Sequence, residues 1–110
     1  MDVVAASNAA ESARLATEVA RRHPAVRQLI LFGSRARGDF DAHSDHDIYA
    51  RFDYSAMSWV DYIELIRDLE AAFGTDVDLV SGFDVATKTP VLWSQIQKEG
   101  ILLYDCQENR

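Results

Sequence analysis

Two aspartates separated by one residue are the strongest chemical signal in the sequence. Asp45 and Asp47 stand in "DHDIYARF" (45–52), whose partial alternation and Ile, Tyr and Phe residues are typical of a β-strand. Side chains two apart on a strand point to the same face, with bases roughly 7 Å apart at ~3.3 Å per residue. Two such carboxylates repel each other, and a hard cation with oxygen ligands relieves the repulsion. Because Mg²⁺ commonly uses one or two carboxylates plus substrate phosphates, the pair predicts a magnesium site.

A later segment offers a third acid. "TDVDLVS" (75–81) predicts a short strand on which Asp76 and Asp78 share one face. If this strand neighbours the first, we expect Asp78, which has apolar residues on both sides, to complete the acidic cluster. Asp76 lies nearer the mouth of the strand. His46 alternates to the opposite face, which favours a surface or packing role over metal binding.

The residues upstream of the acids have the chemistry of a phosphate grip. Gly33 ends an apolar run, and its missing Cβ lets a ligand approach the backbone closely. Ser34 would open a short helix, where free N–H groups and the helix dipole favour phosphate. Arg35 and Arg37 supply planar, permanently charged guanidinium groups suited to phosphate oxygens. Together with the acids these residues predict a nucleoside-triphosphate site, although the Walker A, G-x-G-x-x-G and zinc signatures are absent.

Composition and charge limit the classes of function. The chain has 110 residues, a size typical of one domain, so we expect a single domain over residues 1–110. The net charge of −7 argues against non-specific binding of DNA or RNA, because such binding needs many cationic side chains. No apolar run of ~18 residues exists, so we expect no membrane span. The single cysteine cannot form an internal disulfide, and the N-terminal residues lack the basic region of a signal peptide, so we expect a cytoplasmic location.

Capping and periodicity signals supply the frame that must position these residues. Asn8 with Glu11 resembles a capping box, and Thr89 with Pro90 resembles a helix start. We expect helices over residues 8–23, 34–37, 58–73 and 89–99, and strands over 26–33, 45–52, 75–81 and 101–105. The third helix should bury an apolar face made of Trp59, Val60, Ile63, Ile66, Leu69, Ala72 and Phe73. Helices alternating with short strands predict an α/β or α+β fold, a small sheet packed against helices.

The motifs match a known family. Gly33-Ser34, ten intervening residues and then Asp45-His46-Asp47 match the G-S-x₁₀-D-x-D signature of DNA polymerase β-like nucleotidyltransferases. The fuller "GSRARG…SDHDI" resembles the minimal nucleotidyltransferase (MNT) branch, and the later "VDLV" and "IQKEGILLYD" are also similar to MNT domains. The resemblance covers nearly the entire chain. It implies the nucleotidyltransferase fold, with a small mixed sheet of about four strands.

The resemblance also implies roles for individual residues. Asp45 and Asp47 would be ligands of two Mg²⁺ ions, which makes them catalytic residues. Asp78 would be the third carboxylate, helping the catalytic metal and accepting the proton of the attacking hydroxyl group. Gly33 and Ser34 would hold the triphosphate of ATP.

The resemblance further implies a partner. MNT proteins that resemble this one are typically paired with HEPN-domain proteins, which are helical ribonuclease toxins, and attach AMP from ATP to a tyrosine of the toxin. We therefore expect an antitoxin that AMPylates its partner, in a hetero-oligomer or a homodimer that supplies the acceptor platform. Two alternatives stay open: a small-molecule nucleotidyltransferase of the aminoglycoside type, and a non-catalytic antitoxin that acts by binding alone.

Overall fold

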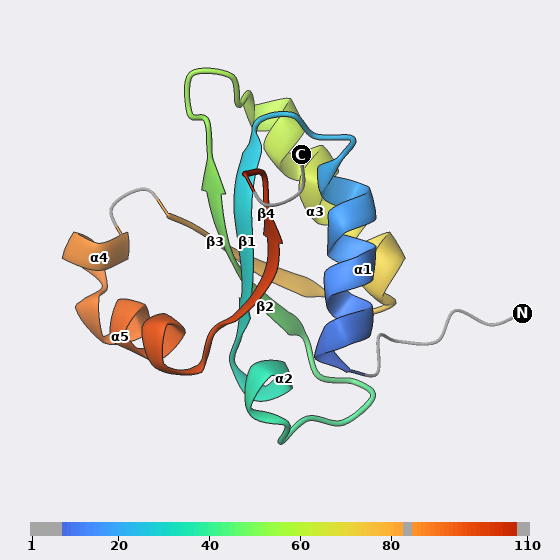
Figure 1. The fold of residues 1–110 in the computed structure, drawn as a ribbon, viewed down its shortest axis with the longest axis vertical. Helices are drawn as coiled ribbons and strands as arrows, with labels where there is room; N and C mark the ends of the chain where they lie inside the picture. The colour runs from blue at the N-terminus through green and yellow to red at the C-terminus, as the bar shows by residue number, and fades with distance from the viewer. Residues whose placement is uncertain (1–7, 83–84, 108–110) are drawn as a thin grey trace, which may run out of the picture.

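A mixed four-stranded sheet forms the centre of the fold (Figure 1). The computed structural model describes residues 8–82 and 85–107. The strands are β1 (Val26–Phe32), β2 (His46–Phe52), β3 (Val77–Ser81) and β4 (Ile101–Asp105), in the order β3-β2-β1-β4. β1 is antiparallel to β2 and to β4, whereas β2 and β3 are parallel. This arrangement confirms the predicted α/β fold with a small mixed sheet of about four strands.

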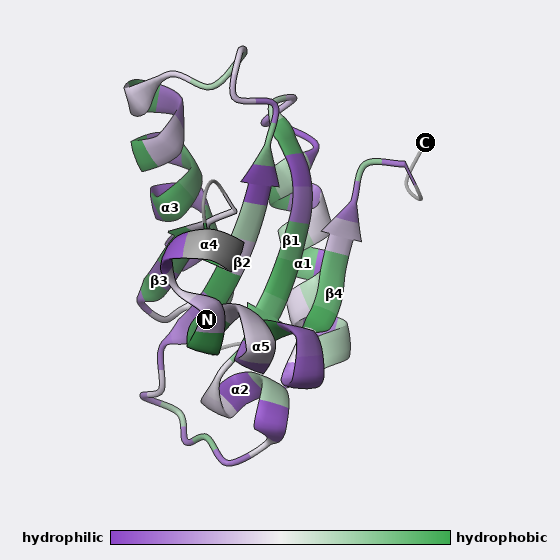
Figure 2. Cartoon of the chain, turned by 90° about the vertical axis from the view of Figure 1, so that its left-hand side faces the viewer, coloured by the Kyte–Doolittle hydropathy of each residue, from purple (hydrophilic) through white to green (hydrophobic). Residues whose placement is uncertain are grey.

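Helices cover both faces of the sheet. The helices α1 (Ala9–Ala20) and α3 (Trp59–Phe73) pack on one face, and the helices α4 (Val85–Lys88) and α5 (Pro90–Glu99) lie on the other (Figure 1). The main core lies under α1 and α3, and a smaller cluster lies under α4 and α5. Figure 2 shows hydrophobic residues along the halves of β1 and β4 that lie nearer α5. In the described part of the chain, none of the helices has the length and apolar character to cross a membrane.

The parallel pairing of β2 and β3 depends on α3. A chain that leaves one strand and enters a parallel neighbour must cross over, usually through a helix. Ser58 begins α3 with a complete capping box formed with Asp61, and Gly74 ends it in the left-handed conformation. Because the two parallel strands begin at the same end of the sheet, the crossover brings the residues at both strand starts together.

Several element boundaries differ from the predicted ones. α1 ends at Ala20, three residues earlier than predicted. Amides after this point bond to the carbonyl three residues back instead of four, as Arg22 N–H does to Val19. β2 begins at His46, so Asp45 lies just before the strand, and β3 begins only at Val77. The first bond between these strands runs from His46 N–H to the carbonyl of residue 76, and the residues before it have no partner strand. The short helix α4 was not predicted.

The predicted apolar face of α3 is partly wrong. Trp59 is 74% exposed, Val60 61% and Ile63 38%. The fully buried side chains are instead Leu65 and two residues that the prediction includes, Leu69 and Phe73. These three buried residues form one stripe along the helix. Because an α-helix turns 100° per residue, Val60 and Ile63 lie far from the centre of this stripe, and Trp59 stands at the first position of the helix. The sheet therefore contacts only the narrower stripe.

Candidate functional site

The parallel strands place two of the predicted acids side by side. Asp47 on β2 is the direct partner of Asp78 on β3. Both belong to the face of the sheet that carries α4 and α5, because Tyr49 and Val80, two residues further along each strand, pack in the cluster under those helices. Asp45 lies two residues before Asp47, at the entrance to β2. The expectation that the two acidic strands are neighbours is confirmed.

Asp47 is the electrostatic centre of this group. Burial raises the pKa of its half-buried carboxyl group, and the charges of Asp78 and Asp45 raise the pKa further, while Arg37 lowers it. Asp45 and Asp78 are themselves exposed. Among the described residues, no donor forms a hydrogen bond with any of these three carboxylates. The group therefore carries mutual repulsion that the charge of Arg37 offsets only in part.

These residues fit a divalent cation that is shared with a substrate. Clustered, unpartnered carboxylates are oxygen ligands of the kind that Mg²⁺ uses. In residues 8–82 and 85–107, however, no three His, Cys, Asp or Glu side chains are already arranged as a metal-binding set. Mg²⁺ keeps several waters and often takes the rest of its ligands from substrate phosphates, so it does not need a closed protein cage.

Gly33 is required where it stands for two separate reasons. It follows Phe32, the β1 residue that pairs with Asp47, and it turns the chain out of the strand with φ +74°. That conformation is unfavourable for residues with a side chain. In addition, a Cβ at this position would overlap the Asp47 carboxylate. The glycine therefore lets the turn and the acid lie in contact, and that Gly33 holds phosphate stays a prediction.

Ser34 begins the one-turn helix α2 (Ser34–Arg37) directly after this glycine. The amides of Ala36 and Arg37 donate to the Gly33 carbonyl and close the turn. No described residue accepts a hydrogen bond from the amide or the hydroxyl group of Ser34. Both donors therefore remain available to an anion beside Asp47.

The two arginines of α2 have different surroundings. Arg35 is buried, and its Nε donates to the Ser44 carbonyl at 2.9 Å while Nη2 donates to the Asp41 carbonyl at 3.2 Å. Its guanidinium also lies over the Phe40 ring, 4.6 Å from the centroid. In this geometry Arg35 holds the loop that leads to Asp45. That Arg35 contacts phosphate stays a prediction.

Arg37 is exposed and is paired with two carboxylates. Its Nε contacts Asp39 Oδ2 at 3.2 Å, and its Nη1 contacts Glu99 Oε1 at 3.1 Å and Oε2 at 3.2 Å. Nη2 has no partner among the described residues. The guanidinium is thus held at Nε and Nη1, and Nη2 is left for a ligand. That Arg37 contacts phosphate also stays a prediction.

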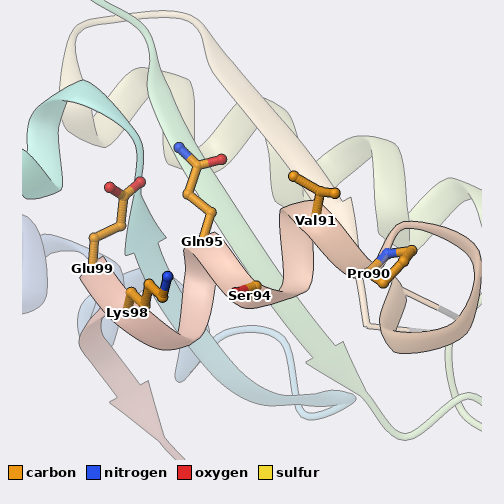
Figure 3. A pocket seen from close by; sticks show the side chains of 6 residues that line it. All are labelled: Pro90, Val91, Ser94, Gln95, Lys98 and Glu99. Atoms are coloured by element: carbon orange, nitrogen blue, oxygen red, sulfur yellow. The ribbon is translucent and has the colours of Figure 1, made fainter.

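Glu99 is a member of the site that the sequence reasoning missed. It is the last residue of α5, and its Oε1 accepts a hydrogen bond from Gly33 N–H at 2.9 Å. Burial alone would raise the pKa of Glu99, but the bonds from Gly33 and Arg37 outweigh it and lower the pKa. Figure 3 shows Glu99 and Gln95 extending from α5 to the same side. The available signal was the position of Glu99 just before β4, the strand next to β1.

His46 belongs to the core, which is the packing one of the two roles, surface or packing, that the alternation favoured. It is fully buried, stacks on Phe73 with ring centroids 4.2 Å apart, and contacts Ser12 Oγ and Thr75 Oγ1. Burial, with the nearby charge of Arg35, lowers the pKa of His46 to about 4. The neutral imidazole anchors the start of β2 from the face opposite Asp47.

The site is thus a strand that ends in a glycine turn against one aspartate, with a second aspartate beside it on a parallel strand. The sequence profile of the family described as Polymerase beta, Nucleotidyltransferase matches residues 16–109. This chain belongs to that family. The match confirms the resemblance on which the site assignments were based.

More specific relatives narrow the class. Over 57 residues the chain is 44% identical to "Putative protein adenylyltransferase MJ1379" of Methanocaldococcus jannaschii, a match that covers 51% of this chain and 57% of that protein. The chain therefore spans little more than half the length of this relative. It is also similar to the crystal structure of a toxin–antitoxin with AMP-PNP, with a TM-score of 0.64, 27% identity, and coverage of 90% of this chain and 76% of the other.

A further solved complex contains tri-AMPylated Shewanella oneidensis HEPN toxin and MNT antitoxin. The TM-score is 0.59 at 24% identity, over 90% of this chain and 73% of the other. This likeness establishes a shared fold. The expected resemblance to the MNT branch is supported by the solved "Structure of putative minimal nucleotidyltransferase", with a TM-score of 0.64 and 29% identity over 81% of this chain and 86% of the other.

Proposed function

We propose that the chain is an antitoxin that transfers AMP from ATP to a tyrosine of a HEPN-domain toxin. The observation that carries the proposal is the pairing of Asp47 with Asp78, in contact with Gly33, in a member of a nucleotidyltransferase family. The AMP-PNP in a related toxin–antitoxin structure supports ATP as the nucleotide donor. The HEPN toxin in a complex of the same fold suggests the class of acceptor.

Three carboxylates would hold the metal. Asp45, Asp47 and Asp78 provide oxygen ligands in one unpartnered group, which suits two Mg²⁺ ions that share a substrate triphosphate. When bound, such ions would stabilise the negative charge that develops on the phosphate oxygens during transfer. Two adjacent anions that repel in the free protein would then become complementary to the metal-bound substrate.

The residues of the chain position and deprotonate the reactants. Ser34 and Arg37 offer donors to the phosphates, and Gly33 lets the turn that carries them lie directly against the Asp47 carboxylate. The tyrosine oxygen attacks the α-phosphorus, the bond from this phosphorus to the oxygen that bridges to the β-phosphate breaks, and pyrophosphate leaves. Asp78, which is exposed, takes the proton from the tyrosine hydroxyl group. AMP is then joined to the toxin through a phosphodiester bond.

Transfer of label from ATP tests the proposal. The chain is purified together with the helical protein encoded beside it, and the complex is incubated with Mg²⁺ and ATP labelled at the α-phosphate. We expect label on the helical protein, and its loss when the acceptor tyrosine is replaced by phenylalanine. Asp45→Ala and Asp47→Ala should each reduce transfer on the order of a thousandfold, because each removes a metal ligand.

The same assay separates the other functions. Transfer of label to an aminoglycoside and not to protein would indicate a small-molecule enzyme. A complex that forms, carries no label, and still protects cells after Asp45→Ala and Asp47→Ala would indicate neutralisation by binding alone. Either result would contradict the proposed AMPylation.

A further inference from the structure

We infer that Glu99 is a positioning residue, which fixes the Gly33 amide and the Arg37 guanidinium so that the turn can receive the nucleotide phosphates. The inference rests on the proposed function, since it names what prepares that site. It concerns a residue 66 positions away from Gly33 in the sequence, on a different element.

The contacts of Glu99 join both parts of the phosphate grip. One carboxylate oxygen, Oε1, accepts from Gly33 N–H at 2.9 Å and from Arg37 Nη1 at 3.1 Å. The other oxygen, Oε2, contacts the same Nη1 at 3.2 Å. Hydrogen bonds that involve a charged group are roughly twice as strong as neutral ones. A single side chain therefore couples the backbone of the turn to its exposed cation.

The backbone that carries Glu99 is held on both sides. Glu99 is the last residue of α5, and β4 begins two residues later and pairs with β1 through Ile101 and Leu31. Continuing that antiparallel register by two residues places Glu99 opposite Gly33. Gly100 between them is tightly packed, because an added Cβ would overlap the Ile96 carbonyl. The Glu99 side chain is only 17% exposed.

This anchoring argues for positioning over competition with the nucleotide. A carboxylate that merely occupied the phosphate site would have to leave it when the nucleotide binds. The backbone of Glu99, however, is held in place by α5 on one side and by β4 on the other. Its bond orients Arg37 without using all of the guanidinium, because Asp39 and Glu99 take Nε and Nη1 and leave Nη2 for a ligand oxygen. Figure 3 shows the Glu99 carboxylate directed away from the α5 ribbon, at the end of the pocket that this helix lines.

Substitution of Glu99 tests the role through nucleotide binding. We expect Glu99→Ala to weaken AMP-PNP binding about tenfold, measured by calorimetry with Mg²⁺. In the transfer assay the loss should fall on the KM for ATP, with kcat nearly unchanged. Glu99→Gln keeps an acceptor oxygen for Gly33 N–H and should recover part of the affinity. Glu64→Ala, which removes an exposed carboxylate from α3, is the matched control and should bind as the unaltered protein does.

A double substitution tests whether Glu99 acts through Arg37. Arg37→Ala should weaken binding, and the pair Glu99→Ala with Arg37→Ala should weaken it by less than the product of the two single effects, because the residues share one contact. Multiplicative effects would contradict coupling through this ion pair. Unaltered or tighter AMP-PNP binding by a folded Glu99→Ala protein would overturn the inference and indicate a competing carboxylate.

The Gly33 amide provides a readout without nucleotide. In the ¹⁵N-labelled protein, Glu99→Ala should move the Gly33 amide resonance and speed its hydrogen exchange. The values for Glu99→Gln should lie between those of the unaltered protein and those of Glu99→Ala. An unchanged Gly33 signal would contradict positioning of the turn. If the unaltered protein fails to bind AMP-PNP, the proposed function fails, and this amide still shows separately whether Glu99 holds the turn.

Discussion

Asp47 combines a structural cost with the metal-binding role that we propose for it. Burial, and then the charges of Asp78 and Asp45, raise the pKa of its carboxyl group in the folded protein. A folded state with a raised carboxyl pKa favours the protonated form more than the unfolded chain does. The stabilising contribution is therefore present at low pH and is lost as the pH rises through the raised pKa. At neutral pH without metal, ionised Asp47 destabilises the fold.

Asp47→Asn should separate stability from activity. Asparagine has nearly the same size and carries no charge, so we expect a higher melting temperature at pH 7 in metal-free buffer, together with a transfer rate reduced on the order of a thousandfold. Thermal denaturation and the labelled-AMP assay measure the two effects. Asp45→Asn is the control: Asp45 is exposed and its charge is the smaller contribution to the Asp47 pKa, so the rate should fall with a smaller stability gain. A lower melting temperature for Asp47→Asn would contradict the assigned electrostatics.

His46 should make the fold sensitive to mild acid. Its pKa is lowered to about 4 in the folded protein, first by burial and then by Arg35. The unfolded chain takes up this proton near pH 6.5 and the folded one does not, so stability falls as the pH drops from about 6.5 to about 4. The total effect is on the order of 3 kcal/mol. Urea unfolding at a series of pH values measures the loss of stability. If the His46 imidazole titrates near pH 6.5 in NMR spectra of the folded protein, the assignment is refuted.

The turn between β1 and α2 shows why one glycine matters to the site and its neighbour does not. Gly33 and Gly38 both have positive φ, +74° and +88°, so alanine is strained at either position. A Cβ at Gly33 would overlap Asp47, whereas a Cβ at Gly38 meets nothing within 4 Å. The two positions therefore share the backbone strain and differ in the contact with the acid.

Gly33→Ala and Gly38→Ala form a matched pair of substitutions. We expect each to destabilise the fold by about 1 kcal/mol or more through backbone strain, measured by urea denaturation. Only Gly33→Ala should also abolish AMP transfer, because Asp47 must move away from the turn. Equal activity in the two variants would show that the contact between Gly33 and Asp47 does not matter for the reaction.

At the level of the folded chain, the net charge argues against non-specific binding of nucleic acids. The chain carries −7, and several arginines are already paired, as in Arg14 with Glu18 and Arg27 with Asp53. Non-specific nucleic-acid binding needs many free cations along one surface. We expect no retention of RNA or DNA in filter binding at physiological salt, which means a Kd weaker than about 10⁻⁴ M. Retention that falls steeply with added salt would contradict this expectation.

Much of the site was predictable from short-range patterns. The Gly33-Ser34 turn, the spacing of Asp45 and Asp47, and the strand that carries Asp78 all follow from turn chemistry and two-residue alternation, which depend on neighbours in the sequence. The same alternation placed His46 on the face opposite the acids and left open whether it is packed or exposed. These features are local, so the order of residues alone was enough to indicate a nucleoside-triphosphate site, and the resemblance of the same motif to a known family indicated a nucleotidyltransferase.

The contacts between distant segments required the folded chain. The parallel register sets Asp78, and not Asp76, beside Asp47, while packing turns Arg35 into the loop and leaves Arg37 near Glu99. α3 buries a narrower stripe than its sequence indicates, because only the side chains that meet the sheet lose water. Such contacts depend on where whole elements meet in space. No local pattern encodes that position, because it results from the packing of all the elements at once.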